Sequence, residues 1–383
     1  MAVVGAGLIG VRHAEVYADY DRCRLAVVCD VQEARARELA ERFGCDWCTD
    51  VWEIATSDVD GVSLATPDFA HTEPALALLA AGKHVLFEKP LTTDLAEAGW
   101  IVEAVRERGV KAMMNLPRRW NPHFVAVKRA VEAGEIGRPV MGYVRLSNTL
   151  HVPTSMLEWA GRSGPQWFLL PHSMDHMRWV LGQEARRVFA TGRKGVLTAR
   201  GIDAFDAMHV VVDFDDAFAT FETTWIIPEN WPEIVETQFV LYGSEGRIGL
   251  DGNAVLLATN LASSTRPFGT GNQSVYGKSP SFTVAEIRHF VDCLADDQPP
   301  AGATVEDGRA VVAMIRAAEL SIEKRQPIDV ANLIRDETQC RPSPDLPAKT
   351  ARQPGAASES AERRSITSAA ADRGRPAGRR RAG

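Results

Sequence analysis

The chain has 383 residues, of which 45% are hydrophobic and 24% charged, so it is long enough to bury the cores of two domains. Its net charge of −7 is uneven: residues 341–383 hold ten Lys and Arg against four Asp and Glu, which leaves −13 on the first 340 residues and argues against a nucleic-acid groove there. No apolar run reaches the roughly 18 residues of a membrane span, and the first residues lack the basic start and cleavage site of a signal peptide, so we expect a cytoplasmic protein without a membrane partner.

Strand and helix patterns alternate over the first 118 residues. Short apolar runs predict strands, and the longer segments between them have the apolar spacing of helices. The predicted strands lie within residues 1–7, 24–30, 59–67, 83–90 and 111–117, and the predicted helices within 8–20, 31–44, 72–82 and 94–109. This βαβα order predicts a parallel, doubly wound sheet in a first domain over residues 1–118.

The pattern changes in the second part of the chain, residues 119–335. Longer strands with alternating apolar residues are predicted at 140–148, 205–214, 217–227, 236–251 and 254–259. Such alternation favours a large, mainly antiparallel open sheet with one solvated face. Two helical segments, 282–296 and 305–325, are expected to close this domain. The sequence therefore predicts an α/β protein with a doubly wound first domain and an α+β second domain for substrate binding and oligomerisation.

The last segment and the cysteines predict no further chemistry. Residues 336–383 are rich in Pro, Ala, Ser and Arg and poor in large apolar residues, which predicts a disordered basic tail. The six Cys residues do not have the spacing of a secreted disulfide framework. Cys45 and Cys48 form a C-x-x-C pair, but no second Cys or His pair stands at zinc spacing, so we favour packing in a short strand over a metal or redox site.

A glycine-rich turn joins the first predicted strand to the first predicted helix. It matches G-x-G-x-x-G, in which backbone N–H groups at a helix N-terminus hold a pyrophosphate. Asp30 ends the next strand, where an acidic residue binds the ribose hydroxyls of NAD and repels the 2′-phosphate of NADP. An ordinary glycine turn followed by a strand-end Asp is the alternative; we favour a Rossmann-type site for NAD, with NADP less favoured. The predicted cofactor contacts of this turn are Gly5, Gly7, Leu8, Ile9 and Gly10.

Glu88 and Lys89, a candidate ion pair, lie at the carboxyl end of the strand predicted within residues 83–90. Glu88 and Lys89 follow an apolar run and are sealed by Pro90. Ligands of open α/β sheets bind at the carboxyl ends of the strands, so Lys89 is a candidate for chemistry. An ammonium there can hydrogen-bond an alcohol oxygen and stabilise its alkoxide character. A surface Lys and Glu at a strand end is the alternative.

The chain resembles the Gfo/Idh/MocA family of oxidoreductases, named for glucose-fructose oxidoreductase and inositol dehydrogenase. The resemblance covers residues 1–335 and is carried by four segments in family order. They are GAGLIGVRH at 5–13, ATPDFAHTEPALALLAAGKHVLFEKPLTTDLAEA at 65–98, RRWNPHFVAVKRAVEAGEIGRP at 118–139 and HSMDHMRWVLG at 172–182. It implies a Rossmann domain followed by a domain with a large open sheet.

The resemblance implies roles at the strand ends of the first domain. In the family the Lys of E-K-P lies beside the nicotinamide and the substrate hydroxyl, and the Glu lies near the nicotinamide ribose. These roles fall on Lys89 and Glu88. Thr66, Pro67 and His71 match the segment that lines the cofactor, although His71 equally fits a histidine that bonds backbone groups at a helix start.

The resemblance also implies a catalytic histidine, His172, and here the chain departs from the family. The family commonly has an Asp four residues before this His, and the chain has Phe168 there. A carboxylate that binds substrate hydroxyls or orients the proton relay is therefore missing. Asp175 remains as a candidate partner for His172, or supports the helix structurally. A core or capping histidine is the alternative for His172, and His176 is expected to be structural.

Aromatic and basic residues surround the expected substrate pocket. Trp159, Trp167 and Phe168 offer flat faces for a sugar ring or an apolar cyclic compound, with packing in the core as the alternative. Arg118 and Arg119 follow a predicted strand and could reach an acidic substrate or the cofactor, with ordinary solvated arginines as the alternative. The predicted substrate contacts are Lys89, Arg118, Trp167, His172 and Asp175.

These patterns together predict an NAD-dependent dehydrogenase or reductase that acts on a secondary alcohol of a sugar, polyol or sugar acid. Lys89 and His172 are its predicted catalytic residues. Two alternatives share the fold: a glycosidase that uses NAD for transient oxidation, and a non-catalytic NAD-sensing regulator, against which the retained Lys89 and His172 argue. The long alternating strands would otherwise expose an apolar face, so we expect a homodimer or homotetramer.

Overall fold

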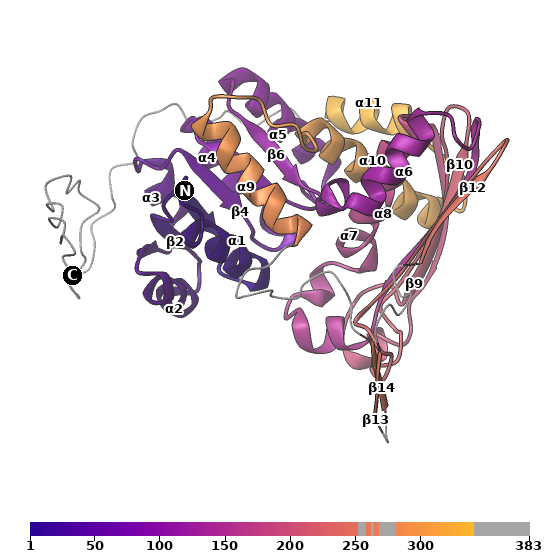
Figure 1. The fold of residues 1–383 in the computed structure, drawn as a ribbon, viewed down its shortest axis with the longest axis horizontal. Coiled ribbons are helices and arrows are strands. Elements are labelled where there is room, and N and C mark those ends of the chain that lie inside the picture. Colours follow the sequence, from indigo (N-terminus) through magenta and orange to yellow (C-terminus); the bar gives the residue numbers. More distant parts are fainter. Residues whose placement is uncertain (252–257, 262–263, 268–280, 341–383) are drawn as a thin grey trace, which may run out of the picture. The chain divides into compact units, whose positions relative to one another are not determined.

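The computed structural model describes residues 1–251, 258–261, 264–267 and 281–340, which belong to one compact unit. Two large sheets organise it, one in each half of the chain (Figure 1). The strand predicted at 254–259 lies mostly outside the described residues. So does the part of the predicted tail beyond residue 340.

The first sheet has six parallel strands in the order β3-β2-β1-β4-β5-β6. This order confirms the predicted doubly wound sheet, because the strands run outward in both directions from a central switch point. The strands are β1 (Ala2–Val4), β2 (Val27–Cys29), β3 (Asp46–Cys48), β4 (Gly61–Leu64), β5 (His84–Glu88) and β6 (Ala112–Asn115). Most of their residues are buried, as expected of a sheet that is covered on both faces.

Helices connect these strands, and capping residues in the sequence determine where several of them begin and end. Gly44 and Gly109 end α2 and α5 in the left-handed conformation that glycine adopts without strain. Asp94 begins α5 by accepting hydrogen bonds from the Ala96 and Glu97 N–H groups at 2.9 and 3.1 Å. The helices are α1 (Leu8–Ala18), α2 (Glu33–Phe43), α3 (Val51–Ala55), α4 (Thr72–Ala80) and α5 (Leu95–Arg108), with short 3-10 turns η1 (Asp68–Ala70) and η2 (Pro117–Trp120).

The second sheet is mixed and mostly antiparallel, as predicted, in the order β12-β11-β7-β10-β9-β8-β15. Only the β7–β10 pair is parallel. Its strands are β7 (Pro139–Asn148), β8 (Arg187–Arg193), β9 (Ala207–Asp213), β10 (Phe218–Thr224), β11 (Val235–Gly243), β12 (Arg247–Asp251) and β15 (Ile328–Asp329). A separate two-stranded ribbon is formed by β13 (Ala258–Leu261) and β14 (Ser264–Pro267).

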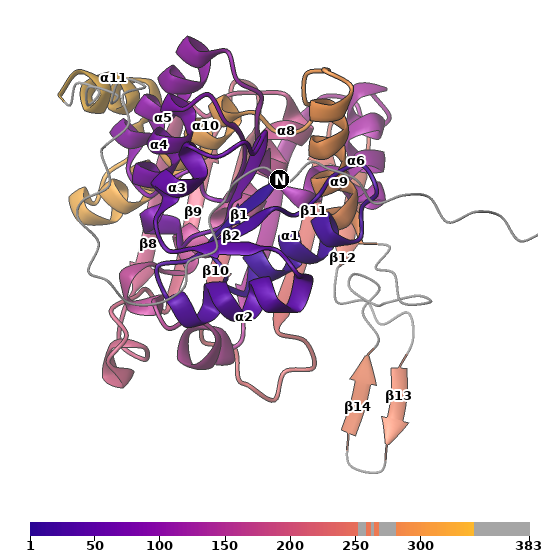
Figure 2. The ribbon, with the colours of Figure 1, turned by 90° about the vertical axis from the view of Figure 1, so that its left-hand side faces the viewer.

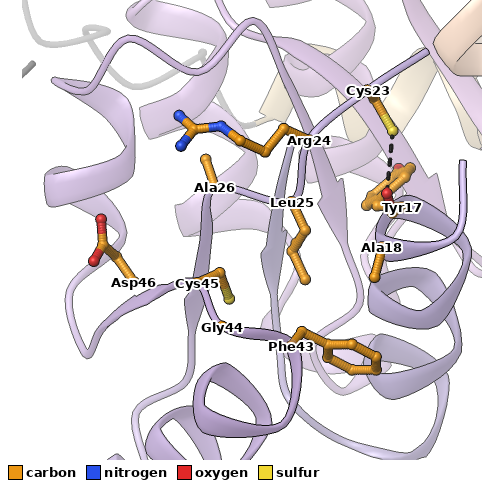
Figure 3. Close-up of a pocket in the computed structure, with 10 residues that line it drawn as sticks. All are labelled: Tyr17, Ala18, Cys23, Arg24, Leu25, Ala26, Phe43, Gly44, Cys45 and Asp46. Carbon is orange, nitrogen blue, oxygen red and sulfur yellow. Dashed lines mark hydrogen bonds between the residues drawn. The ribbon is translucent and has the colours of Figure 1, made fainter. Parts of the chain in front are cut away.

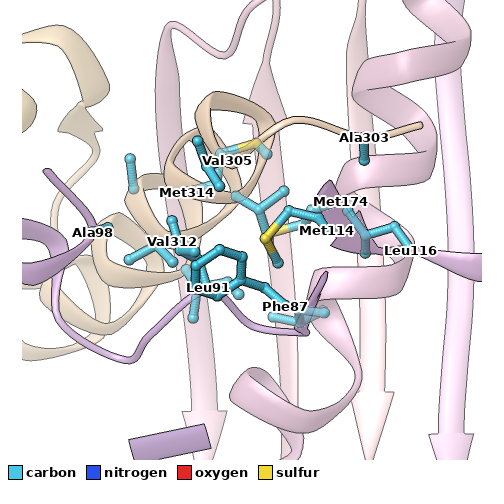
Figure 4. Packing of buried hydrophobic residues seen from close by; sticks show 14 of the residues in the cluster. Phe87, Leu91, Ala98, Met114, Leu116, Met174, Ala303, Val305, Val312 and Met314 are labelled. Atoms are coloured by element: carbon cyan, nitrogen blue, oxygen red, sulfur yellow. The ribbon is translucent and has the colours of Figure 1, made fainter. Parts of the chain in front are cut away.

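Helices on one face of the second sheet join it to the first. Helix α8 (Leu170–Leu181) packs on β7 and β10, and α10 (Val305–Lys324) contacts β8, α8, α5 and β6 (Figure 1). Phe87 and Leu91, on either side of Glu88 and Lys89, are fully buried in this shared core with residues of both helices (Figure 4). The strand end that carries Lys89 is therefore held from both sides. The other helices of this half are α6 (Pro122–Glu132) and α7 (Pro165–Phe168), with short turns η3 (Val152–Met156), η4 (Ala160–Arg162) and η5 (Thr198–Arg200).

The position of helix α9 (Phe282–Ala295) late in the chain suggested that it closes the second domain, but in the structure it does not. It packs against α1, β5 and β6 of the first sheet (Figure 2). Ile287, Phe290 and Val291 share a buried cluster with Val3 and other residues of the first sheet and α1. The prediction for this helix is corrected because periodicity shows which face is apolar but not which surface covers it.

The last described helix also corrects the boundary of the predicted tail. Helix α11 (Val330–Cys340) includes residues 336–340, which the composition had assigned to the disordered segment. It contacts α5 and α10. Within the described ranges, no helix is both long and apolar enough to cross a membrane.

We expect the protein to be a dimer or a tetramer through the second sheet. On the face away from α8 and α10, where Figure 1 shows no helix among the described residues, Phe189, Phe218, Met141 and Tyr242 are 37–46% exposed. Met141 is paired with Phe218 and with Tyr242 on the neighbouring strands, and an exposed apolar cluster of this kind favours association. Light scattering at micromolar concentration should give a mass of two or four 41.8 kDa chains, and Phe218→Glu should lower it. A monomeric mass for the unmodified chain would contradict the prediction.

Candidate functional site

The glycine turn brings β1 and α1 close together at the carboxyl edge of the first sheet. Gly5 has φ +100°, and a Cβ on it would lie 2.4 Å from the Ala65 carbonyl oxygen. A Cβ on Gly10 would lie 1.7 Å from the Gly5 carbonyl oxygen, whereas one on Gly7 would meet nothing within 4 Å. Only Gly7 therefore faces open space, at the residue that precedes the first turn of α1.

The start of α1 has the properties of a cofactor cradle. Leu8 is 70% exposed and Ile9 41% exposed, so the first turn of the helix is uncovered. Asp30, at the end of β2, accepts hydrogen bonds from the Ala6 N–H at 2.7 Å and the Gln32 N–H at 2.8 Å, which hold its carboxylate beside the turn. Free backbone N–H groups, open space at Gly7 and an adjacent carboxylate fit the pyrophosphate and ribose of a dinucleotide.

The loop after β4 is tied to the loop after β5. The ring nitrogens of the fully buried His71 lie 2.9 Å from the Thr66 carbonyl oxygen and 2.8 Å from the Pro90 carbonyl oxygen. The Thr66 hydroxyl donates to the Ala70 carbonyl at 3.1 Å, and Pro67 precedes η1. Of its two predicted roles, His71 has the one that bonds backbone groups. It fixes the relative position of the loops that contain Thr66 and Lys89.

Glu88 is buried in a network of polar side chains. Its carboxylate accepts hydrogen bonds from Asn115 and, at 3.0 Å, from His13, while His13 reaches the Ser63 hydroxyl at 2.7 Å with its other ring nitrogen. Burial raises the pKa of Glu88, but His13, Asn115 and the charge of Lys89 outweigh it and hold the pKa below its usual value. Glu88 is therefore a rigid carboxylate directly before Lys89. The sequence analysis did not predict the roles of His13 and Asn115. The position of His13 on the first helix, three residues after Gly10, could have indicated that it lies near the cofactor turn.

Lys89 is partly buried and faces the second half of the chain. Its ammonium donates a hydrogen bond to the Phe168 carbonyl oxygen at 3.0 Å and lies 4.2 Å from the centre of the Phe168 ring. Burial lowers the pKa of Lys89, while the charges of Glu88 and Asp68 oppose that decrease. A desolvated ammonium of this kind is suited to hydrogen-bond a reacting oxygen.

Asp68 is a second carboxylate near Lys89 that the sequence analysis missed. It is 4% exposed, and it accepts hydrogen bonds from the Ser163 hydroxyl and from the Phe69 N–H at 2.8 Å. Burial raises its pKa, against the opposing effects of Ser163, His71 and Lys89. The signal that could have revealed it is its position just after the carboxyl end of β4. It adds a negative charge near Lys89 that Phe168 cannot supply.

His172 lies half-buried in the first turn of α8. Burial lowers the pKa of His172 well below its usual value, and the charges of Lys89 and Arg118 lower it further. Its imidazole is therefore neutral at neutral pH. In the part of the chain that the structure describes, no side chain hydrogen-bonds to this ring. A neutral imidazole without a partner is able to accept a proton from a ligand.

Two predicted substrate contacts, Asp175 and Trp167, have side-chain partners elsewhere in the chain. Asp175 is 1% exposed and forms two hydrogen bonds with Arg119, at 2.6 and 3.0 Å, so its carboxylate stabilises α8 and does not serve His172. Trp167 is 5% exposed in the core and donates its indole N–H to Glu319 of α10 at 2.9 Å. Both side chains therefore form hydrogen bonds that join elements far apart in the sequence.

Phe168 and His176, the other residues named for this region, differ in their surroundings. Phe168 is half-buried and packs edge-on against Trp159 and Trp225, with ring centres 6.3 and 5.8 Å apart. His176 is fully buried between Phe124 and Phe239, and among the described residues neither of its ring nitrogens has a hydrogen-bond partner, which fits the expected structural role.

A separate pocket lies at the opposite edge of the first sheet. It has a volume of about 330 Å³ and is lined by residues before β2, at the end of α1 and between α2 and β3, among them Cys23 and Cys45 (Figure 3). The Cys23 thiol donates to the Tyr17 carbonyl at 3.5 Å, and burial raises the pKa of both thiols. The pocket lies at the amino ends of β2 and β3, whereas the glycine turn and Lys89 follow the carboxyl ends of their strands, so the pocket is separate from that site.

The carboxyl edge of the first sheet thus combines a dinucleotide cradle with an ammonium and a neutral imidazole, as expected of a nicotinamide-dependent oxidoreductase. Residues 1–116 match an oxidoreductase family with an NAD-binding Rossmann fold, and residues 124–249 match the GFO/IDH/MocA C-terminal domain. The chain belongs to the Gfo/Idh/MocA family, and is accordingly an NAD-dependent oxidoreductase.

Individual relatives match along most of their length. The chain is 27% identical to a myo-inositol 2-dehydrogenase of Thermotoga maritima, over 87% of this chain and 99% of that protein. It is 30% identical to an inositol 2-dehydrogenase of Mycolicibacterium smegmatis, over 86% of this chain and 95% of that protein. The solved structure of GenD2 from gentamicin A biosynthesis in complex with NAD is 27% identical, with a TM-score of 0.74, and covers 86% of this chain and 95% of its own.

We expect NAD to bind at least about tenfold more tightly than NADP, which corresponds to about 1.4 kcal/mol. The Asp30 carboxylate accepts hydrogen bonds from ribose hydroxyls and repels a 2′-phosphate. Calorimetric titration of both cofactors should show this difference, and Asp30→Ala should reduce it. Asp46→Ala, at an exposed residue on the adjacent strand, is the matched control. Tighter binding of NADP by the unmodified chain would overturn the expectation.

Proposed function

We propose that the protein oxidises a secondary alcohol of a sugar, polyol or sugar acid to the ketone, or catalyses the reverse reduction. The observation that carries this proposal is the half-buried, neutral and unpartnered imidazole of His172 within the electrostatic reach of the Lys89 ammonium. One group can accept the proton of a hydroxyl, and the other can stabilise the charge that develops on its oxygen. These are the two demands of alcohol oxidation.

In the proposed reaction, residues 5–10 and Asp30 hold NAD, which supplies the acceptor for the hydride that leaves the alcohol carbon. His172 accepts the hydroxyl proton. Lys89 donates a hydrogen bond to the same oxygen and stabilises its alkoxide character. Burial lowers the pKa of Lys89, and the charges of Glu88 and Asp68 oppose that decrease and so favour the ammonium form.

The names of the relatives support a substrate that carries several hydroxyl groups on a ring. Two of them are inositol 2-dehydrogenases, which are named for a secondary alcohol of a cyclic polyol. The half-buried ring of Phe168 lies beside Lys89, and the half-buried ring of Trp159 packs against Phe168; such rings are compatible with a ring-shaped substrate.

A substrate screen tests the proposal. Sugars, cyclic polyols and sugar acids are incubated with NAD, and NADH is followed at 340 nm. Net NADH formation with at least one of them is the expected result. Cleavage of a glycoside without net NADH would instead support the glycosidase alternative, and NAD binding without turnover of any compound would support the regulator.

Both the acidic and the basic limb of the pH–rate profile should lie at lower pH than the usual pKa values of His and Lys would give. The pKa of His172 lies well below 6.5, so His172 stays neutral, and able to accept a proton, as the pH falls through 6.5. The pKa of Lys89 lies below 10.5, so the ammonium is lost earlier than usual as the pH rises. A profile of kcat against pH should therefore show no loss near pH 6.5 and a decline that begins below pH 10.5. A rate that halves near pH 6.5 would contradict the role of His172.

A further inference from the structure

Two consecutive arginines at the end of the first sheet have opposite surroundings. Arg119 pairs with Asp175 at 2.6 Å and with Asp307 at 3.1 Å. Arg118 has no carboxylate partner among the described residues. Its Nη2 donates to the Thr237 hydroxyl at 3.3 Å, and its Nη1 is buried and finds no hydrogen-bond partner within the described ranges. Arg118 is therefore a partly desolvated cation whose charge no group of the described chain neutralises.

Arg118 belongs to the same region as the proposed catalytic groups. It lies in η2, directly after β6, and β6 is the neighbour of the strand that leads to Lys89. Its guanidinium lies 5.3 Å from the centre of the Phe124 ring, and Phe124 also packs against His176, one turn after His172. The charges of Arg118 and Lys89 both act on His172.

The carboxylates of this region do not compensate for Arg118. Glu88 is occupied by His13 and Asn115, and Asp68 by Ser163. Phe168 stands where a further carboxylate was expected one turn before His172. Burial lowers the pKa of Arg118 to about 10, and no nearby carboxylate opposes that decrease. An excess of positive charge thus surrounds the imidazole that is proposed to take the substrate proton.

A buried cation without a counter-ion is unfavourable unless a ligand supplies the missing charge. The planar guanidinium matches a carboxylate with two parallel hydrogen bonds, and Nη1 still has its donors free. We propose that the substrate carries a carboxylate that Arg118 binds, so that the enzyme acts on a sugar acid rather than on a neutral polyol. This inference rests on the proposed function and narrows its substrate class.

The test compares sugars that differ only in the carboxylate. D-glucuronate and D-galacturonate are each measured against D-glucose and D-galactose, with NAD present, both by NADH formation and by calorimetric binding to the NAD-loaded protein. We expect each acid to be preferred over its neutral sugar by about 10- to 100-fold, as a charged hydrogen-bonded pair contributes. Arg118→Gln should abolish that preference, because it lowers the values for the acids by about 10- to 100-fold more than those for the neutral sugars, and Arg118→Lys should retain part of the preference.

Arg129→Gln removes the same charge from an exposed residue of α6 and should leave the preference intact. The NAD affinity and melting temperature of Arg118→Gln report whether the variant is folded. Equal use and equal binding of acids and neutral sugars by the unmodified protein would overturn the inference, as would an Arg118→Gln variant that keeps the preference. Oxidation of neutral polyols alone would overturn the inference and leave the proposed function standing. Binding of the acids through Arg118 without NADH formation from any compound would support the inference and overturn the proposed function.

Discussion

Replacement of Lys89 by Met is expected to lower turnover by about 10²- to 10⁴-fold, or roughly 3 to 5 kcal/mol of barrier, while NAD still binds. Met keeps an unbranched apolar side chain beside the Phe168 ring but removes the ammonium that is proposed to stabilise the reacting oxygen. The glycine turn that holds the pyrophosphate is not altered. Turnover on the best substrate from the screen, with NAD affinity from fluorescence titration, provides the measurement.

His172→Ala should cost a similar factor, because Phe168 leaves no carboxylate one turn away to take over its role. The double variant should lose less than the product of the two single losses if Lys89 and His172 act on one oxygen. His123→Ala, at an exposed histidine of α6, is the matched control and should retain full turnover. If Lys89→Met stays within a few-fold of the unmodified protein while NAD binds, Lys89 is not catalytic.

Two glycines of the same turn should separate folding from cofactor binding. Gly10→Ala would put a Cβ 1.7 Å from the Gly5 carbonyl oxygen, and the backbone would have to move apart. We expect a loss of at least about 3 kcal/mol of folding free energy, since overpacking by a small group already costs about 1 to 3 kcal/mol. Gly7→Ala meets nothing within 4 Å in the chain itself, so its melting temperature should stay close to that of the unmodified protein.

NAD affinity should nevertheless fall in Gly7→Ala, because the new methyl group enters the space where the backbone is expected to approach the pyrophosphate. Thermal unfolding without NAD and calorimetric titration with NAD distinguish the two effects. Unchanged NAD affinity in Gly7→Ala would show that the pyrophosphate binds elsewhere. Unchanged stability in Gly10→Ala would contradict the close approach of β1 and α1.

The parallel sheet was predictable from the sequence alone, and the same local signals assign the candidate cofactor site to the carboxyl ends of its strands. Alternating strand and helix periods specify a doubly wound order, and the glycines and Asp30 follow β1 and β2 at positions where local geometry leaves few choices. Local signals of this kind come from neighbours in the chain. The mixed second sheet was predictable in type, because its strands alternate in polarity, but its one parallel pair was not, since β7 and β10 are separated by about 70 residues.

The partners of the site residues were less predictable. Asp175 stands three residues after His172, which suggested that the two cooperate, yet its carboxylate pairs with Arg119 from another part of the chain. Trp167 was a candidate for the pocket because tryptophan suits both a binding face and a core, and only Glu319, 152 residues away, decides between them. A residue type permits several roles, and contacts with distant segments of the chain determine which of them the residue has.

The return of α9 to the first sheet has a consequence for synthesis on the ribosome. Val3, Leu86 and Met113 share their buried cluster with Ile287, Phe290 and Val291. The strands that carry the first three are complete about 180 residues before the helix that covers them has been made. At bacterial and eukaryotic elongation rates this interval lasts roughly 10 to 40 s. During this interval part of an apolar face of the nascent first sheet is uncovered, and exposed apolar surface of this kind promotes aggregation until α9 packs on it.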